Sequence, residues 1–338
     1  MITILTDCSL KKLNTFRLEA KSKYLVKVAD ALELNLVMNF CREHSCNWQV
    51  IGGGSNLLFT KNFDGVTISM ATHKIEILDQ DEHSASVRAE AGVVWDDFVE
   101  FCVKNSLYGA ENLSAIPGTV GASPVQNVGA YGVEAKDIIR QVEYFSTEDC
   151  QFKTIAAEEC RFAYRDSIFK HDLAKRAIVT AVQFKLSKVE SYNLSYGNLE
   201  EKVLEMGEKP TLELVRGAVV AIRNEKLPNP AEIGSAGSFF RNPIVAVEVA
   251  EAISKNYPDI KLYPVDAERV KVPAGWLIDR AGWKGYRRGD AGVYERQALV
   301  LVNYGQATGA QILQLAEDIC ADVKQKFGVE LDFEAIVI

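Results

Sequence analysis

The strongest constraint on the fold is the stretch of residues 109–134, GAENLSAIPGTVGASPVQNVGAYGVE, which shows no regular secondary-structure pattern. A loop of this length inside a compact domain is usually functional or disordered. This one lacks the charge of a disordered segment, because its glycines alternate with Ser, Thr, Asn and Ala. Its backbone N–H groups could form a concave anion site. The stretch therefore favours a folded, ligand-binding loop.

A second glycine-rich stretch, IGGGSN at residues 51–56, follows a predicted strand, where phosphate-binding loops often sit. The Gly-x-Gly-x-x-Gly fingerprint would need glycine at Leu57, and no Gly-Lys-Ser/Thr follows, so a Rossmann nucleotide site is not supported. A plain tight turn is the alternative. Together with residues 109–134, the stretch favours one extended phosphate-bearing ligand. A flavin dinucleotide is long enough to touch both.

The hydrophobic pattern predicts a mixture of short strands and helices. The N-terminal half carries period-2 segments such as VTISM and SASVRAEA, and it has amphipathic helices at 31–45 and 95–106. Around Tyr196 the pattern changes to helices, which places a domain boundary near residues 190–230. A long helix is predicted at 309–327, opened by a capping box of Thr308 and Gln311. The tail VELDFEAIVI alternates like a last strand.

Length and charge exclude several classes of protein. The 338 residues are enough for two or three domains. The net charge of -8 shows no basic excess, which argues against a nucleic-acid partner. No apolar run approaches the ~18 residues of a membrane span. The N-terminal MITILTDCSLKK lacks the features of a signal peptide and is expected to be a first strand.

The cysteines and histidines predict neither a disulfide framework nor a metal site. The seven cysteines are irregularly spaced without a Cys-x-x-Cys pair, and the four histidines are scattered. Free cysteines in this number are typical of a reducing cytoplasm. We therefore expect a cytoplasmic protein without a bound metal.

Two further segments could carry chemistry. The first, CRFAYRDSIFK at 160–170, is either an arginine fork for a carboxylate or phosphate, or a helix-to-strand joint with an internal ion pair. The second, IGSAGSFFRNP at 233–243, holds Ser238 between small residues and two phenylalanines. Small residues allow close approach of the backbone. The segment is not a Gly-x-Ser-x-Gly nucleophile elbow, which argues against a Ser-His hydrolase.

Six segments in order resemble one family, that of the UDP-N-acetylenolpyruvoylglucosamine reductases, over the chain from about Leu13 to the C-terminus. They are NTFRL (14–18), IGGGSNLL (51–58), AIPGTVGASPVQNVGAYG (115–132), FAYRDSIFK (162–170), GSAGSFFRNP (234–243) and AGWLIDRAGWKG (274–285). LSYGNL resembles the branch of the family with a tyrosine-bearing loop over the substrate, and it places that tyrosine at Tyr196.

The resemblance implies an FAD-binding domain of the vanillyl-alcohol oxidase (PCMH) type, built from two α+β lobes, and a separate α+β substrate-binding domain. We expect the FAD-binding domain at 1–190, with its lobes split near 65–70. A connector with the tyrosine loop is expected at 191–215 and the substrate-binding domain at 216–310. The segment 311–338 is expected to supply a helix and a tail with the catalytic glutamate.

The resemblance also implies the residues of the site. The catalytic residues would be Arg165, the proton donor Ser238, and Glu334, for which Asp332 is the alternative because the tail departs from the family's usual Glu-Pro-Glu. The expected FAD-binding residues are Gly52, Gly53, Gly54, Ser55, Asn56, Pro117, Gly118, Gly121, Ala122 and Gly129. The expected substrate-binding residues are Tyr131, Tyr164, Tyr196, Arg223, Lys226, Asn242, Lys284 and Gln297.

The activity implied by the resemblance is reduction of UDP-N-acetylglucosamine enolpyruvate to UDP-N-acetylmuramate in peptidoglycan precursor synthesis. NADPH would be the co-substrate and FAD a noncovalent cofactor, in a cytoplasmic monomer. Two other functions compete. An oxidase of alcohols or hydroxy acids on the same scaffold would use a His or Tyr base and would consume oxygen. A non-enzymatic nucleotide-binding module would stay colourless with added FAD.

Overall fold

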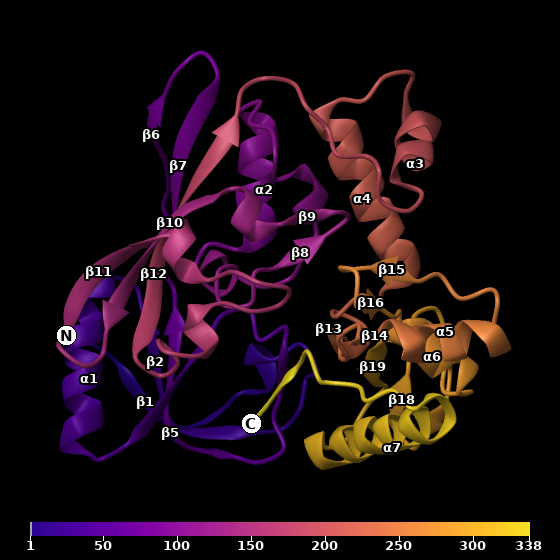
Figure 1. Cartoon of the computed structure of the whole chain (residues 1–338). Helices are drawn as coiled ribbons and strands as arrows, with labels where there is room; N and C mark the ends of the chain where they lie inside the picture. Colours follow the sequence, from indigo (N-terminus) through magenta and orange to yellow (C-terminus); the bar gives the residue numbers. More distant parts are fainter. Residues whose placement is uncertain (1) are drawn as a thin grey trace. The chain divides into compact units, whose positions relative to one another are not determined.

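The computed structural model describes residues 2–338, which form two compact units (Figure 1). The first unit contains residues 2–8, 22–53 and 63–223. The second contains residues 9–21, 54–62 and 224–338. Two short N-terminal segments thus belong to the second unit, because Phe16, Leu18 and Leu58 lie in its hydrophobic core. Among the described residues, no helix is both long and apolar enough to cross a membrane.

The first lobe of the first unit is a four-stranded sheet covered by one helix. Its strand order is β1-β2-β5-β3, and β2 and β3 both run parallel to β5. Its elements are β1 (Ile4–Ser9), β2 (Lys21–Val28), α1 (Leu34–Glu43), β3 (Asn47–Ile51) and β5 (Phe63–Met70). Buried apolar side chains of α1 pack with those of β2 and β5. The helix predicted from residue 31 begins at Leu34, because Ala31–Glu33 forms a 3-10 turn closed by Asp30 and Glu33.

The second lobe is a five-stranded antiparallel sheet with the order β11-β10-β12-β7-β6. Its elements are β6 (Ile75–Gln80), β7 (Ser84–Glu90), α2 (Trp95–Lys104), β10 (Ile139–Ser146), β11 (Gln151–Ala156) and β12 (Ala177–Ser187). The aromatic rings of Trp95 and Phe98 on α2 pack against Phe184 on β12. This packing buries one face of the sheet and confirms the helix predicted at 95–106, which ends at Lys104.

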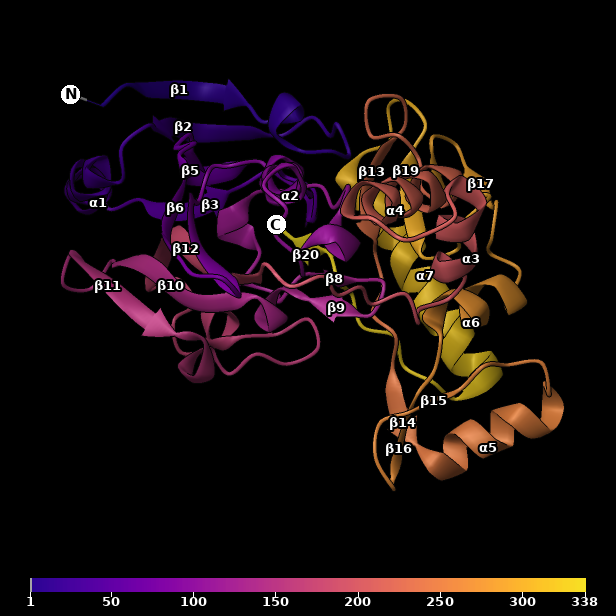
Figure 2. The ribbon, with the colours of Figure 1, turned by 90° about the horizontal axis from the view of Figure 1, so that it is seen from above.

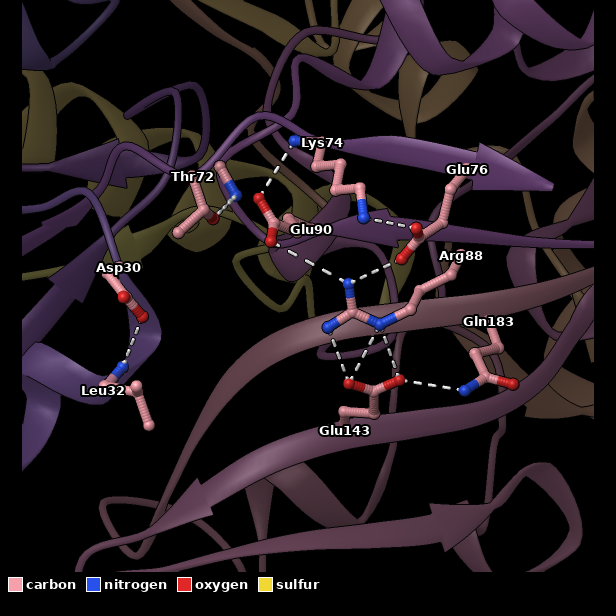
Figure 3. Close-up of polar contacts among 10 residues, drawn as sticks. Asp30, Leu32, Thr72, Lys74, Glu76, Arg88, Glu90, Glu143 and Gln183 are labelled. Carbon is pink, nitrogen blue, oxygen red and sulfur yellow. Dashed lines mark hydrogen bonds and ion pairs between the residues drawn. The ribbon is translucent and has the colours of Figure 1, made fainter. Parts of the chain in front are cut away.

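The other face of this sheet carries a polar network around Arg88 (Figure 3). The guanidinium of Arg88 holds the carboxylate of Glu143, with Nε 2.9 Å from Oε1 and Nη2 2.8 Å from Oε2. Gln183 Nε2 donates to the same carboxylate at 2.9 Å. Strand β12 lies between the strands of Arg88 and Glu143: its Gln183 pairs with Arg88, and its Ala181 pairs with Glu143. Burial alone would raise the pKa of Glu143, but the hydrogen bonds from Arg88 and Gln183 lower it.

The glycine-rich stretch 109–134 is folded rather than structureless. It contains the 3-10 turns Glu111–Leu113 and Val120–Ala122 and the hairpin of β8 (Gly129–Ala130) and β9 (Val133–Glu134). Further 3-10 turns lie at Lys11–Leu13, Ala135–Asp137, Ala157–Cys160 and Ile168–Lys170. Short turns stabilised by single hydrogen bonds leave no helix or strand period in the sequence, which is why the pattern showed none.

The first unit ends in two helices that pack on each other, α3 (Leu199–Met206) and α4 (Leu212–Lys226). Buried apolar residues such as Val203 and Val219 form this small core, and Tyr131 and Tyr192 pack against it. Residues 224–226 of α4 are assigned to the second unit, so the division falls after Arg223.

The second unit contains two further sheets, a short strand pair and three helices. The sheets have the orders β13-β19-β18-β17 and β14-β16-β15, and β20 pairs with β4 in parallel. The strands are β4 (Leu57–Leu58), β13 (Gly234–Ser238), β14 (Ile244–Ala246), β15 (Tyr263–Pro264), β16 (Arg269–Lys271), β17 (Arg287–Arg288), β18 (Ala291–Val293), β19 (Val300–Asn303) and β20 (Ile336–Val337). The helices are α5 (Val247–Asn256), α6 (Ala274–Arg280) and α7 (Gly309–Phe327).

The core of the second unit forms around α7. Ile312, Leu315 and Ile319 on its inner face are buried with residues of α6 and β18. In Figure 2, α5 lies beside β14 and β16, and its buried Ala250 and Ile253 belong to the same core. The predicted capping box is confirmed, because Thr308 Oγ1 accepts from the N–H of Gln311 at 3.2 Å. The predicted α+β class is confirmed as well.

Candidate active site

The two glycine-rich stretches meet in the first unit. A Cβ on Gly53 would lie 2.9 Å from the Cα of Gly118, and one on Gly52 would lie 2.6 Å from Thr119 Oγ1. A Cβ on Gly121 would lie 2.7 Å from that of Ala91. A side chain at Gly53 or Gly121 would collide with the facing backbone, and one at Gly52 would collide with the Thr119 side chain, so glycine suits these positions. The approach joins two segments that are more than sixty residues apart in the chain, as residues 53 and 118 show.

Both segments were predicted to bind the phosphate-bearing part of FAD. Loops rich in glycine expose backbone N–H groups to which a diphosphate can bind. The short turn at Val120–Ala122 and the exposed Pro117 lie on the same loop. Gly52, Gly53, Gly118, Gly121 and Ala122, all predicted to bind FAD, lie in these two segments.

The rest of the IGGGSN segment belongs to the second unit. Gly54 has φ of +63°, and a Cβ there would overlap the carbonyl of Leu13. Asn56 Nδ2 donates to the carbonyl of Glu334 at 3.0 Å, and the N–H of Ile336 donates to the carbonyl of Asn56 at 2.9 Å. Ser55, between Gly54 and Asn56 in the sequence, is half-buried. Asn56, which was predicted to bind FAD, thus also holds the tail that carries Glu334.

Arg165 lies against the β8–β9 hairpin. Its Nη2 donates to the carbonyl of Gly129 at 2.9 Å, and its guanidinium lies over the ring of Tyr164, 5.3 Å from the ring centroid. Arg165 has φ of +56°, which is uncommon for a residue other than glycine. Such backbone conformations cluster at functional sites because the surrounding structure must hold them in place. Lys170 Nζ contributes by donating to the carbonyl of Arg165 at 2.7 Å.

Three residues predicted to bind substrate gather at the tip of this hairpin. Tyr131 stands at the tip with φ of +49°, and Gly132 follows with φ of +80°, a pair typical of a tight type I′ turn. The rings of Tyr131 and Tyr196 meet edge to face, with centroids 6.0 Å apart. Burial raises the pKa of Tyr131, and the nearby charge of Arg223 opposes that rise. Burial likewise lowers the pKa of Arg223, and the nearby Tyr131 and Asp96 oppose this decrease.

Ser238 ends β13 in the second unit, where the strand is irregular. Ser235 pairs with Val302 and Ser238 with Val300, so one extra residue is accommodated between them. Gly237, with φ of +67°, lies in this bulge. Bulges of this kind re-aim a side chain. The rings of Phe239 and Phe240, which follow the serine in sequence, contact each other, and both contact Phe333 in the buried core.

Glu334 lies beside the serine segment through its backbone. Its N–H donates to the carbonyl of Phe239 at 2.8 Å, and the neighbouring Phe333 forms a bridge with Phe240. The side chain of Glu334 is half-buried, whereas Asp332 is exposed and its carbonyl accepts from the N–H of Arg241 at 2.9 Å. Glu334 is therefore the less exposed of the two candidate carboxylates.

The remaining predicted substrate residues also lie in the second unit. Asn242 Oδ1 accepts from the N–H of Ala274 at 2.9 Å, so it orients the start of α6. Gln297 Oε1 accepts from the N–H of Leu299 at 3.3 Å. Lys284 pairs with Asp279 at 3.1 Å on the surface, where such a pair is weak and easily exchanged for a ligand. Lys226 is exposed at the end of α4.

Comparison with known proteins identifies the family. A family model described as the C-terminal domain of UDP-N-acetylenolpyruvoylglucosamine reductase matches residues 229–338, and a model of an FAD binding domain matches residues 22–152. The UDP-N-acetylenolpyruvoylglucosamine reductase of Pseudomonas savastanoi pv. phaseolicola is 46% identical over 96% of both chains. The one from Bacteroides fragilis is also 46% identical over 96% of both. The chain belongs to the UDP-N-acetylenolpyruvoylglucosamine reductase family.

A solved structure of the family agrees with this assignment. The crystal structure of the reductase from Thermus caldophilus is 25% identical and has a TM-score of 0.67, covering 100% of this chain and 98% of that one. Family membership, together with the FAD-binding domain, makes the chain an FAD-dependent oxidoreductase of peptidoglycan precursor synthesis. The predicted family, the predicted cofactor FAD and the two-part architecture are confirmed.

The sequence reasoning missed one group of residues in this reductase fold. Asp96, in the first turn of α2, accepts hydrogen bonds from Arg216 on α4 and from the N–H of Ala115. One available signal was the spacing of Arg216 and Arg223, which is two helical turns and therefore puts both on one face of α4. An acidic residue in the first turn of a helix is usually explained by the helix dipole alone.

Proposed function

We propose that this chain reduces UDP-N-acetylglucosamine enolpyruvate to UDP-N-acetylmuramate with NADPH as the electron source. FAD, bound without a covalent link, supplies the hydride. The observation that supports the proposal is the backbone hydrogen bond between Glu334 and Phe239, the residue that follows Ser238, in a chain of this family. Neither glycine-rich stretch contains a histidine, a residue that could form a covalent flavin link.

Ser238 acts as the acid in this proposal. After the enolpyruvyl group accepts a hydride at its terminal carbon, negative charge develops on the neighbouring carbon and its carboxylate. A carbon centre with this much charge takes a proton from a weak acid, so a serine hydroxyl is sufficient. The phenylalanines that follow the serine keep the segment apolar and limit access of water.

Arg165 and Glu334 stabilise the same charge. Arg165, a planar double donor, suits the substrate carboxylate and opposes the negative charge as it grows. Its backbone is held by Lys170, and its guanidinium by Gly129, so its position is defined before substrate arrives. Glu334 shares a proton with the substrate carboxylate and so donates a hydrogen bond to the same oxygens.

The substrate's UDP part is assigned to the remaining residues. Lys226 supplies a point charge for the diphosphate, with Asn242 as a further donor, and Tyr196 donates its hydroxyl from a mobile loop. Tyr131, Tyr164 and Arg223 belong to the first unit. Lys284 and Gln297 complete the set in the second.

The domain roles and cellular setting belong to the same proposal. Residues 1–190 bind FAD, 191–215 carry the tyrosine loop, 216–310 bind substrate, and 311–338 carry Glu334. The protein works as a cytoplasmic monomer that requires no metal, nucleic acid or membrane. The net charge of -8 and the irregularly spaced cysteines support this setting.

A visible spectrum, recorded anaerobically in three steps, tests the function. The purified protein should be yellow, NADPH should bleach it, and the UDP-linked enolpyruvyl sugar should restore the colour while UDP-N-acetylmuramate appears. Acid precipitation should release the flavin into the supernatant. A colourless protein that stays colourless with FAD refutes the proposal. Steady oxygen consumption with simple alcohols, without reaction with the sugar nucleotide, would favour an oxidase instead.

A further inference from the structure

Ala115 is held by hydrogen bonds to the peptide groups on both sides of its Cα. Its N–H donates to Asp96 Oδ1 at 2.6 Å, and its carbonyl accepts from Arg223 Nε at 3.1 Å. Arg216 forms a bidentate hydrogen bond to the same aspartate, with Nη1 2.7 Å from Oδ1 and Nη2 2.9 Å from Oδ2. One carboxylate therefore connects the start of α2, the loop at Ala115 and helix α4.

The hydrogen bonds from Asp96 and Arg223 hold Ala115 in a backbone conformation that alanine disfavours. Ala115 has φ of +55°, in the left-handed region where a Cβ crowds the following carbonyl. A residue stays there only where neighbouring contacts over-determine its position. Asp96 and Arg223 supply those contacts, one to each end of the residue. Without them, the loop would spend part of its time in other conformations.

Ala115 connects two parts of the proposed site within the first unit. In the chain it directly precedes the segment with Pro117, Gly118 and Gly121, which is assigned to FAD. Its carbonyl orients the guanidinium of Arg223, which is assigned to the substrate. A shift of Ala115 would displace both sets of groups at once.

The charges favour the same arrangement. Burial alone would raise the pKa of Asp96, but the hydrogen bonds from Arg216 and Ala115 lower it, so the carboxylate stays ionised. Arg223 is desolvated by burial, and the negative charge of Asp96 counteracts the cost of keeping its cation. A neutral residue at position 96 would leave Arg223 without this compensation.

We propose that Asp96 and Arg216 are positioning residues, which hold Ala115 so that the flavin loop and Arg223 are both in place before their ligands bind. The inference rests on the proposed function. The affinity of a site falls in proportion to the fraction of protein in the competent conformation. Loss of the contacts of Asp96 with Arg216 and Ala115 should therefore weaken binding of both ligands more than it slows the chemical step.

The experiment compares Asp96→Asn with Glu143→Gln. Both changes neutralise a carboxylate held by a two-armed arginine, and the two pairs are similarly buried, with side-chain exposures of 18% and 33% for Arg216 and Asp96 and 22% for each of Arg88 and Glu143. The readouts are the FAD Kd of the apoprotein by quenching of flavin fluorescence, the KM for the sugar nucleotide, kcat, and the thermal unfolding midpoint. Arg216→Lys and Arg88→Lys form a second matched pair, in which charge is kept and the fork is lost.

Asp96→Asn should raise the FAD Kd and the KM each by roughly tenfold, with a kcat within about threefold of wild type. The reason is that the contacts of Asp96 set the fraction of protein in the binding-competent conformation. Glu143→Gln should leave both within twofold although its unfolding midpoint falls by a similar amount. Arg216→Lys should act in the same direction as Asp96→Asn. If Asp96→Asn does not fold, the comparison of the two lysine variants decides the question.

Equal effects of the two members of either pair on FAD affinity and KM would overturn the inference. So would a fall in kcat with both binding constants unchanged. Failure of the proposed function is separate, because wild-type protein would then bind no FAD or would not react with the sugar nucleotide. Wild-type binding and turnover, with Asp96→Asn no different from Glu143→Gln, refutes only the positioning role.

Discussion

The N–H of Glu334 donates to the carbonyl of Phe239 at 2.8 Å, so the tail of the chain is paired with the residue that directly follows Ser238. Asn56 holds the same tail from the other direction by donating to the carbonyl of Glu334 at 3.0 Å. Two backbone contacts thus define where the glutamate lies relative to the serine segment. The roles proposed for Ser238 as proton donor and for Glu334 as carboxylate require such a defined relationship.

Ser238→Ala should impair only the second half-reaction. NADPH should bleach the flavin at close to the normal rate, while reoxidation by the enolpyruvyl substrate slows by at least ~10²–10⁴, the usual contribution of a positioned proton donor. Ser238→Cys should recover part of the loss, because a thiol can donate from nearly the same place. Anaerobic stopped-flow absorbance measures each half separately. Equal slowing of both halves would indicate a damaged fold, and normal reoxidation would point to another acid.

Glu334→Gln and Asp332→Asn separate the two candidate carboxylates. Glu334→Gln should lower the rate of reoxidation by about 10²-fold or more, since it removes a group that stabilises charge in the transition state. Asp332→Asn, on an exposed side chain, should stay within about threefold of wild type, as surface substitutions usually do. The reverse ranking in the same stopped-flow measurement would assign the catalytic role to Asp332.

Lys226→Ala should raise the KM for the sugar nucleotide by about one to two powers of ten, because losing a charge-assisted contact costs roughly 1.5–3 kcal/mol. Lys255→Ala is the control, since Lys255 is an exposed lysine in the last turn of α5 and has no assigned role. Steady-state kinetics with the sugar nucleotide as the varied substrate provide the measurement. A KM equal to that of the control would remove Lys226 from the diphosphate site.

Glu143 should make folding stability depend on pH in the acid range. Because its pKa is lower in the folded chain than in the unfolded one, its stabilisation is fully present above the unfolded value, about 4.3, and is lost as pH falls through the folded value. Glu143→Gln should cost about 1–3 kcal/mol at pH 7 and should reduce the loss of stability on acidification. Urea unfolding between pH 7 and pH 3 tests this. An identical pH slope in both proteins would contradict the assignment.

Local patterns predicted the regular elements well, and the reasons are visible in particular residues. The apolar stripe and the Thr308–Gln311 box of α7 involve residues three or four positions apart, so both can be read directly from the sequence. The tail was less well predicted. Its alternation suggested a strand, but only Ile336–Val337 pair with another strand, β4, whereas Phe333 and Glu334 bond to the segment of Phe239 and Phe240.

The sequence by itself determined the family, the flavin cofactor and the candidate residues, because the order and spacing of six motifs are properties of the linear chain. Only the tertiary structure decided which of these residues meet. Two examples are the close approach of Gly53 to Gly118 and the ion pair of Asp96 with Arg216, 120 positions away. Both depend on how helices and loops pack, which cannot be read from a local sequence pattern. Ala115 illustrates the difference: in the sequence it is an ordinary alanine, and in the structure it has a left-handed backbone to which two distant side chains are hydrogen-bonded.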